Sequence, residues 1–185
     1  IEKKLSLGFV LDGDIEFDNC TIIGDLDISR LQLDRVSTVK IMNSFFKKGS
    51  KLNCSEIHFG NQGYHAIDIK DSIIEGDCDF SGIRDSIFLN LKNVYFMKGL
   101  KTLGTKVEKN STIENLGFPS QYNSEIEKSR KELYETLKAS GLENKAKELD
   151  ILPKETSKKS SKFDMDAYQV AYSSGFLNPD QAAFC

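Results

Sequence analysis

Apolar and polar residues alternate in short runs that repeat along the first two thirds of the chain. The run 15–22 has apolar residues at its first, third and last positions and an asparagine at its fifth. The pattern returns at 39–46, 67–74 and 89–96, and its second half returns at 110–113, with Val107 as a displaced apolar position. Because successive side chains of a strand point to opposite faces, each run predicts a strand with one buried face.

A second alternating strand follows each run after a glycine. It covers residues 24–29, 49–55 and 76–81 in successive copies. Its predicted inward residues are Leu26 and Ile28, Leu52 and Cys54, and Cys78 and Phe80. The repeat is too short for a crossover helix between paired strands, so we predict a mainly β fold, a right-handed parallel β-helix or solenoid of about four to five turns.

Each copy contains one polar residue at a predicted bend. Asparagine and aspartate tolerate left-handed backbone geometry and bond to nearby backbone groups. We therefore predict a stacked column of corner residues, made of Asn19, Asn43, Asp71, Asn93 and Asn110.

Pairs of small and large inward residues follow the corners. A small residue at Cys20, Ser44, Ser72 or Val94 precedes by two positions a large one at Ile22, Phe46, Ile74 or Phe96. In this respect the stretch from about residue 9 to residue 116 resembles the pentapeptide-repeat proteins. The resemblance implies a right-handed quadrilateral coil. Strict pentads are absent and the spacing varies, so an irregular right-handed parallel β-helix is equally compatible.

The pattern becomes helical after Pro119. Residues 124–140 place Ile126, Leu133, Tyr134 and Leu137 on one stripe before Gly141, and a second helix is predicted over 142–152 with Leu142, Ala146 and Leu149 inward. A similar helical pair follows the coil in some bacterial membrane-associated repeat proteins. We predict a β-solenoid over 1–118, a helical cap over 119–152, a linker over 153–162 and a docking or truncated tail over 163–185.

Composition narrows the function classes. The net charge of -3 does not favour nucleic acid as a partner, and no apolar run is long enough to span a membrane. Four scattered cysteines and two histidines do not match a metal or cofactor motif, so we expect neither. Cysteines at inward positions favour a reducing, cytoplasmic location. The start at Ile1 suggests an excised part of a longer protein, in which any membrane association would lie outside this sequence.

Two outward sets of residues are candidate sites. The first is an acidic face of Asp25, Asp27, Asp77 and Asp79, which strand spacing places about 10 Å apart, as for a sugar-cleaving acid pair or an acidic mimic of DNA. Lys51 and Asn53 fall between these acids, which favours a self-neutralising ladder.

The second set is an apolar stripe that lies between the small and large columns. It is predicted to hold Thr21, Phe45, Ile73, Tyr95 and Thr112, covered either by the chain's own helices or tail or by a partner. His58 is predicted to be an isolated surface histidine. We expect a non-catalytic scaffold or protein interaction module whose partner is another protein or another copy of itself; the alternatives are a carbohydrate-active enzyme and a DNA mimic.

Overall fold

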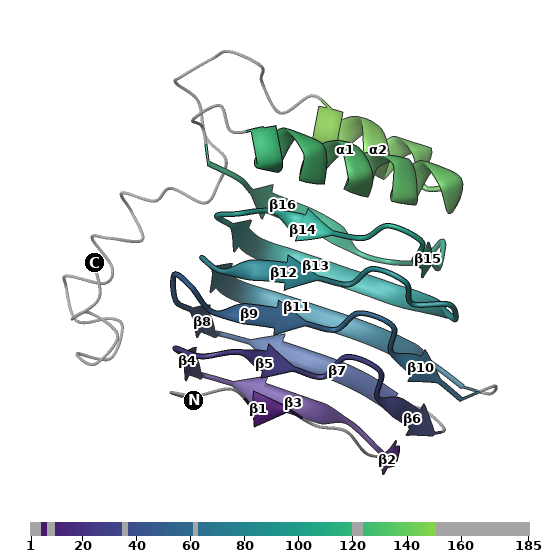
Figure 1. Cartoon of the computed structure of the whole chain (residues 1–185). Coiled ribbons are helices and arrows are strands. Elements are labelled where there is room, and N and C mark those ends of the chain that lie inside the picture. The colour runs from purple at the N-terminus through teal and green to yellow at the C-terminus, as the bar shows by residue number, and fades with distance from the viewer. Residues whose placement is uncertain (1–4, 7–9, 35–36, 61–62, 120–123, 151–185) are drawn as a thin grey trace.

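The chain forms a coil of stacked strands that is closed at one end by two helices (Figure 1). The computed structural model describes residues 5–6, 10–34, 37–60, 63–119 and 124–150. The predicted linker 153–162, the tail 163–185 and Cys185 lie outside these residues.

The strands make three parallel sheets that surround the coil axis. One sheet has the order β1 (Leu5–Ser6), β5 (Leu26–Asp27), β9 (Lys51–Asn53), β12 (Asp77–Asp79) and β14 (Leu100–Lys101). A small sheet has the order β10 (His58–Phe59), β6 (Gln32–Asp34) and β2 (Val10–Asp12). The third has the order β15 (Lys106–Val107), β13 (Ser86–Phe96), β11 (His65–Ile74), β7 (Ser37–Met42) and β3 (Ile15–Asp18), joined by β4 (Thr21–Ile22), β8 (Phe45–Phe46) and β16 (Ile113–Gly117).

The prediction of a mainly β parallel solenoid is confirmed. The strands β3, β7, β11 and β13 run across the back of Figure 1, and β5, β9, β12 and β14 return across its front, which gives about four right-handed turns. Every pair of strands lies in parallel register, as a coil requires.

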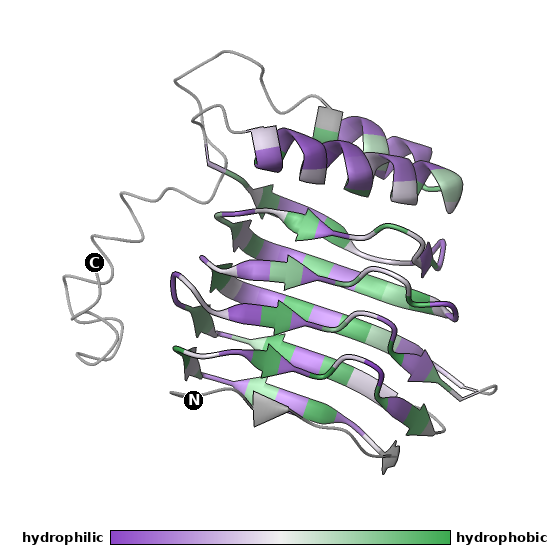
Figure 2. Ribbon diagram, viewed as in Figure 1, coloured by the Kyte–Doolittle hydropathy of each residue, from purple (hydrophilic) through white to green (hydrophobic). Residues whose placement is uncertain are grey.

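Inward residues stack in columns through the coil. One column in the long sheet holds Phe17, Ile41, Ile69, Leu91 and Ile113 in register. The facing sheet stacks Leu26, Leu52, Cys78 and Leu100, none of them more than 2% exposed. Figure 2 shows the apolar bands at corresponding places in successive strands. These stacked columns form the core and explain why apolar residues recur at fixed positions in each copy.

The small inward column is also confirmed, and its serines bind one another. The hydroxyl of Ser72 accepts a hydrogen bond from the backbone N–H of Ser44 at 3.1 Å, and the hydroxyl of Ser44 accepts one from Cys20 N–H at 3.1 Å. Each serine hydroxyl donates to the carbonyl two residues earlier. The buried hydroxyls are thereby satisfied, because each donates one bond and accepts another.

The corner column contains Asn19, Asn43, Asp71 and Asn93, as predicted, but its fifth member is Asn115. All five have φ between 49° and 53°, the left-handed region that asparagine tolerates. The prediction of Asn110 is wrong, because Leu91 pairs with Ile113 and Val94 with Leu116, which places Asn115 above Asn93. Ser111, rather than Val107, stands above Leu89, and its hydroxyl accepts the Leu89 N–H at 3.0 Å. The fifth copy is therefore complete and covers 111–118.

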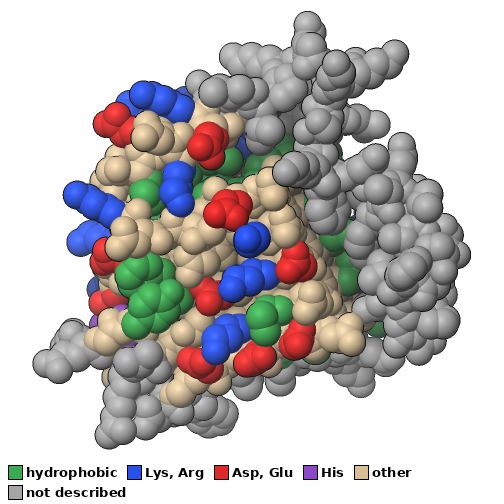
Figure 3. Space-filling model, turned by 180° about the vertical axis from the view of Figure 1, so that it is seen from behind, with side chains coloured by type: hydrophobic (Ala, Val, Ile, Leu, Met, Phe, Trp, Pro, Cys, Tyr) green, Lys and Arg blue, Asp and Glu red, His purple; other side chains and the backbone are tan. Residues whose placement is uncertain are grey.

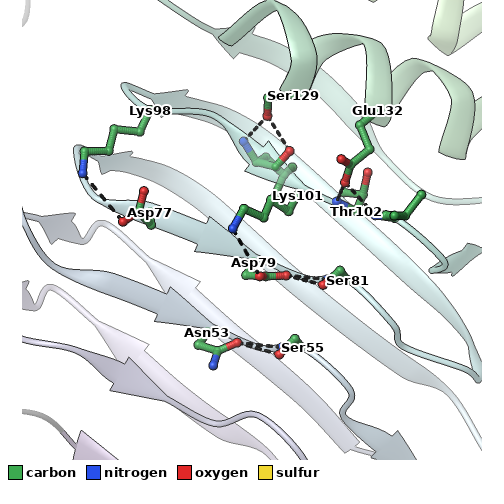
Figure 4. A network of polar contacts seen from close by, with 12 residues as sticks. Asn53, Ser55, Asp77, Asp79, Ser81, Lys98, Lys101, Thr102, Ser129 and Glu132 are labelled. Carbon is green, nitrogen blue, oxygen red and sulfur yellow. Dashed lines mark hydrogen bonds and ion pairs between the residues drawn. The ribbon is translucent and has the colours of Figure 1, made fainter. Parts of the chain in front are cut away.

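The predicted helical pair consists of α1 (Ser124–Ala139) and α2 (Glu143–Asp150), and α1 lies on the last turn of the coil. Ser129 binds both the N–H and the carbonyl of Leu100. One carboxylate oxygen of Glu132 accepts the N–H groups of Thr102 and Leu103 at 2.5 and 2.7 Å (Figure 4). Side chains of α1 therefore bind backbone groups of the last turn, which would otherwise form hydrogen bonds with the strand of a further turn.

Candidate interaction surfaces

The predicted apolar stripe runs in register along one narrow side of the coil. Thr21 pairs with Phe45, Phe45 with Ile73, and Ile73 with Tyr95. The next position is Gly117, so the prediction of Thr112 in this column is wrong, for the same reason that Asn110 is not a corner residue. The apolar stripe is hereafter Phe45, Ile73 and Tyr95.

Exposure is unequal along the apolar stripe. Ile73 is 3% exposed and lies outside the central core, with Phe45 and Tyr95 beside it in register. Phe45 and Tyr95 are half-buried, and partial burial raises the pKa of the Tyr95 hydroxyl. A Cβ at Gly117 would lie 2.1 Å from the Tyr95 ring, so glycine is the residue that lets this ring pack over the next turn.

The two helices do not cover the apolar stripe. Helix α1 packs against β14 and β15 at the end of the coil, whereas the stripe lies on β8 and the C-terminal parts of β11 and β13. Of the two intramolecular covers expected from the sequence, the helical one is thus excluded. Phe45 and Tyr95 are the half-buried members of the apolar stripe.

The acidic face is built as a ladder of turn-stabilising side chains. Asn53 stands in register between Asp27 and Asp79, and Lys51 pairs with Asp77, as the sequence predicts. The Oδ1 atoms of Asp27, Asn53 and Asp79 each accept the N–H and the hydroxyl of the serine two residues later, Ser29, Ser55 or Ser81. Figure 4 shows the contacts of Asn53 with Ser55 and of Asp79 with Ser81. These three side chains therefore hold the chain in its turn.

Lysines of the next turn neutralise the upper acids of this face. Lys98 lies 3.6 Å from the carboxylate of Asp77, and Lys101 lies 3.8 Å from that of Asp79 (Figure 4). Asp25 is half-buried one residue before Leu26, which pairs with Leu52 beside Lys51. Charge therefore alternates from turn to turn in the column of Asp25, Lys51 and Asp77, and Asn53 separates Asp27 from Asp79 in the next column.

The outer face of the long sheet mixes acidic and basic side chains (Figure 3). Glu16, Lys40 and Asp68 stand in one register column, and Lys92 pairs with Glu114 at 3.3 Å. The Lys40 ammonium bonds to Asp14 at 2.5 Å and lowers the pKa of that carboxyl. The column pattern produces local neutralisation in place of a continuous negative field.

His58 is exposed, as predicted, but it is not isolated. Its Nδ1 atom lies 2.9 Å from the carboxylate of Asp85, which also accepts the N–H of Phe59 at 2.8 Å. Across the described ranges, no three histidine, cysteine, aspartate or glutamate side chains converge as metal ligands.

An exposed aromatic pair lies near the N-terminal ends of β11 and β13 and was not predicted. The ring of Tyr64 stacks on that of Phe88, with centroids 4.4 Å apart and planes 20° apart. Tyr64 is 44% exposed, and Phe88 is half-buried. Tyr64 precedes β11 outside the alternating run, so only the register of β11 and β13 reveals that the two rings meet.

A groove of about 550 Å³ lies on the helical hairpin. Its lining includes Tyr134, Leu149 and Arg130, whose guanidinium bonds to Glu127 at 3.0 Å and to the carbonyl of Leu149 at 2.8 Å. Arg130 therefore joins α1 to the end of α2, a role that stabilises the hairpin.

Comparison of the chain with protein-family models, curated proteins and solved structures gave no match. Neither helix in the described part of the chain has the length and apolar character needed to cross a membrane. The description of the protein therefore rests on the fold itself, a parallel β-solenoid with a helical cap.

Proposed function

We propose that the protein is a non-catalytic interaction module, in which the coil is a rigid rod that presents the apolar stripe to another protein or to a second copy of the chain. The observation that carries this proposal is the position of Phe45, which lies half-buried in the register column of the stripe, outside the core and away from the helical cap. Aromatic rings held on a rigid sheet lose little conformational entropy on binding, which favours them as anchors of an interface.

The acidic face supports a structural role better than catalysis. Asp27 and Asp79 bind the serines of their own turns, and Asp77 and Asp79 face lysines at ion-pair distance. An acid pair for sugar cleavage needs two carboxyl groups on either side of one bond, and Asn53 occupies the position between these two rows. The alternating charges likewise favour a scaffold over a DNA mimic.

Kinship with the pentapeptide-repeat proteins is part of the proposal. The column of small residues that continues through Ser44, Ser72 and Val94 supports it. The corner residues are spaced by 24, 28, 22 and 22 positions, from 19 through 43, 71 and 93 to 115, which departs from a regular five-residue unit.

A reducing, cytoplasmic location is supported by the free buried thiols of Cys54 and Cys78.

Two adjacent phenylalanines test the proposal. Phe46 is fully buried and Phe45 is half-buried on the opposite face of β8. If Phe45 serves binding, Phe45→Ser changes the free energy of unfolding of the purified chain by less than about 1 kcal/mol. The matched variant Phe46→Ser costs about 3 kcal/mol or more, because it removes a core ring. Equal losses in the two variants would show that Phe45 is a structural residue, which contradicts the proposal.

A further inference from the structure

The aromatic pair of Tyr64 and Phe88 has the form of a small flat platform on a rigid support. Phe88 lies within β13 and pairs with Ala66 of β11, whose small side chain leaves room on the sheet for the Tyr64 ring. The stacked geometry fixes the Tyr64 ring while 44% of the residue stays exposed. An exposed aromatic side chain held in place by another is suited to stacking on a ligand.

Hydrogen-bonding side chains lie along one side of this platform. Asn90 donates to the carboxylate of Asp68 at 2.6 Å and to the Tyr64 hydroxyl at 3.4 Å, and its own carbonyl accepts the N–H of Thr112 at 2.9 Å. Lys40, Asp68 and Asn90 stand in register on successive turns. Their strand spacing of about 4.8 Å makes a regular row of donors and acceptors next to the ring.

The size of the platform favours a small ligand over a protein. A stable protein interface takes about 800 Å² from each partner, which is much more than one exposed tyrosine ring and a half-buried phenylalanine supply. A sugar ring has an apolar C–H face of matching size, which the electron-rich face of an aromatic ring attracts, and hydroxyl groups at its rim. Carboxylate and amide groups can accept from and donate to those hydroxyls.

The charges next to the platform favour a neutral sugar. Asp68 supplies a carboxylate, while the ammonium of Lys40 is held by Asp14 at 2.5 Å. Because Asp68 and Lys40 stand in register and their charges interact, the platform has no excess charge of one sign that would attract an ionised sugar. These contacts place no acid and base together at the platform, so the proposal is for binding and not for catalysis.

We infer that Tyr64, Phe88, Asp68 and Asn90 form a binding site for a neutral oligosaccharide, separate from the apolar stripe. The Tyr64 ring stacks on one sugar ring, and Asp68 and Asn90 bond to the hydroxyls of the same or the next ring. This site adds a ligand class to the interaction module and does not depend on what binds Phe45 and Tyr95.

Titration of the ¹⁵N-labelled chain with cellohexaose, chitohexaose, maltohexaose and mannohexaose tests the inference. We expect at least one of these to shift amide signals of residues 64–68 and 88–90. Tyr64→Ala should weaken that binding by about tenfold or more, whereas Tyr64→Phe should keep most of it. Leu103→Ala is the matched control, since Leu103 is 70% exposed at another part of the coil.

Two results would overturn the inference. One is the absence of shifts at these residues with every hexasaccharide up to about 10 mM, a limit that includes weak sites. The other is a concentration-dependent dimer, seen by sedimentation of the wild-type chain and lost in Tyr64→Ala, which would assign the platform to a contact between copies. The proposed function is tested separately at Phe45, so the two can fail independently.

Discussion

The side-chain amide of Asn93 donates a hydrogen bond of 2.7 Å to the carboxylate of Asp71 in the turn below, and both residues have left-handed backbones. The same contact joins Asn115 to Asn93 at 2.9 Å, whereas the amide of Asn43 donates at 2.9 Å to Asp18, the residue before the corner residue Asn19. The corner column thus combines two properties of asparagine, tolerance of positive φ and an amide that both donates and accepts.

Substitutions at Asn93 separate these two properties. Asn93→Gly keeps the backbone relaxed and loses the amide contacts, which costs about 1 kcal/mol. Asn93→Ala loses the same contacts and adds the strain of a Cβ at positive φ, for a total of about 2 to 3 kcal/mol. Urea unfolding of the two variants measures the difference. A less stable glycine variant would contradict this account of the corner.

The left-handed backbone conformation of Arg30 and Glu56 is predicted to lower the free energy of unfolding. Their φ angles are 59° and 54°, and glycines occupy the corresponding bends at Gly82 and Gly104. The ion pair between Arg30 and Glu56 spans 2.9 Å on the surface, where such pairs contribute little. Arg30→Gly combined with Glu56→Gly should therefore raise the free energy of unfolding by about 1 kcal/mol.

Thermal unfolding tests this pair, with Lys92→Gly as the control at an exposed strand position. A control that loses stability while the double variant gains it would support the strain argument. A double variant that melts below the wild type would show that the ion pair outweighs the strain.

The contact of Glu132 with the last turn predicts a large effect of its removal. Glu132→Ala leaves the N–H groups of Thr102 and Leu103 without their carboxylate partner, at a cost of about 2 kcal/mol. Glu135→Ala is the control, because Glu135 is exposed and lies next to the buried face of α1. It should change the free energy of unfolding by less than about 0.5 kcal/mol. Similar values in chemical denaturation for both variants would show that α1 does not depend on this contact.

The buried thiols predict a loss of stability at high pH. Burial raises the pKa of both Cys54 and Cys78 well above the usual value, so the folded chain keeps protons that the unfolded chain releases. Stability from this source is complete below the unfolded pKa of about 8.5 and falls as the pH rises beyond it, by up to about 1.4 kcal/mol per pH unit for each thiol.

Urea unfolding between about pH 7.5 and about pH 9.5 measures this slope. We expect Cys54→Ala and Cys78→Ala each to reduce it. An unaltered slope in both core variants would contradict the thiol assignment.

The alternation of residues was sufficient to predict the inward columns and the cap helices. Residues such as Leu26 and Ile28, or Leu133 and Leu137, are assigned to a face by local periodicity alone, and all four are buried. The fifth copy of the repeat was misplaced because Ser111 occupies a column that apolar residues fill in the earlier copies. Its hydroxyl accepts a hydrogen bond from a backbone N–H instead. Local pattern could not distinguish this replacement from a shift of register.

Contacts between turns were the part that the sequence did not predict. Tyr64 and Phe88 are 24 positions apart, and the spacing of turns varies, so their stacking depends on the register between β11 and β13. Ile73 likewise lies between Phe45 and Tyr95 of the neighbouring turns and is 3% exposed, although its position in the alternation predicts an outward side chain. Periodicity assigns a residue to a face, whereas its exposure depends on which residues the register places beside it.

Photo-crosslinking from position 45 tests the central claim most directly. A photoreactive phenylalanine analogue at Phe45 in the native host, with one at the exposed Glu16 as control, would be followed by mass spectrometry of the linked peptides. The interaction module predicts links from position 45 to one defined surface of another chain, and none of these from position 16. Links from position 45 to residues of its own chain alone, or no link, would contradict it.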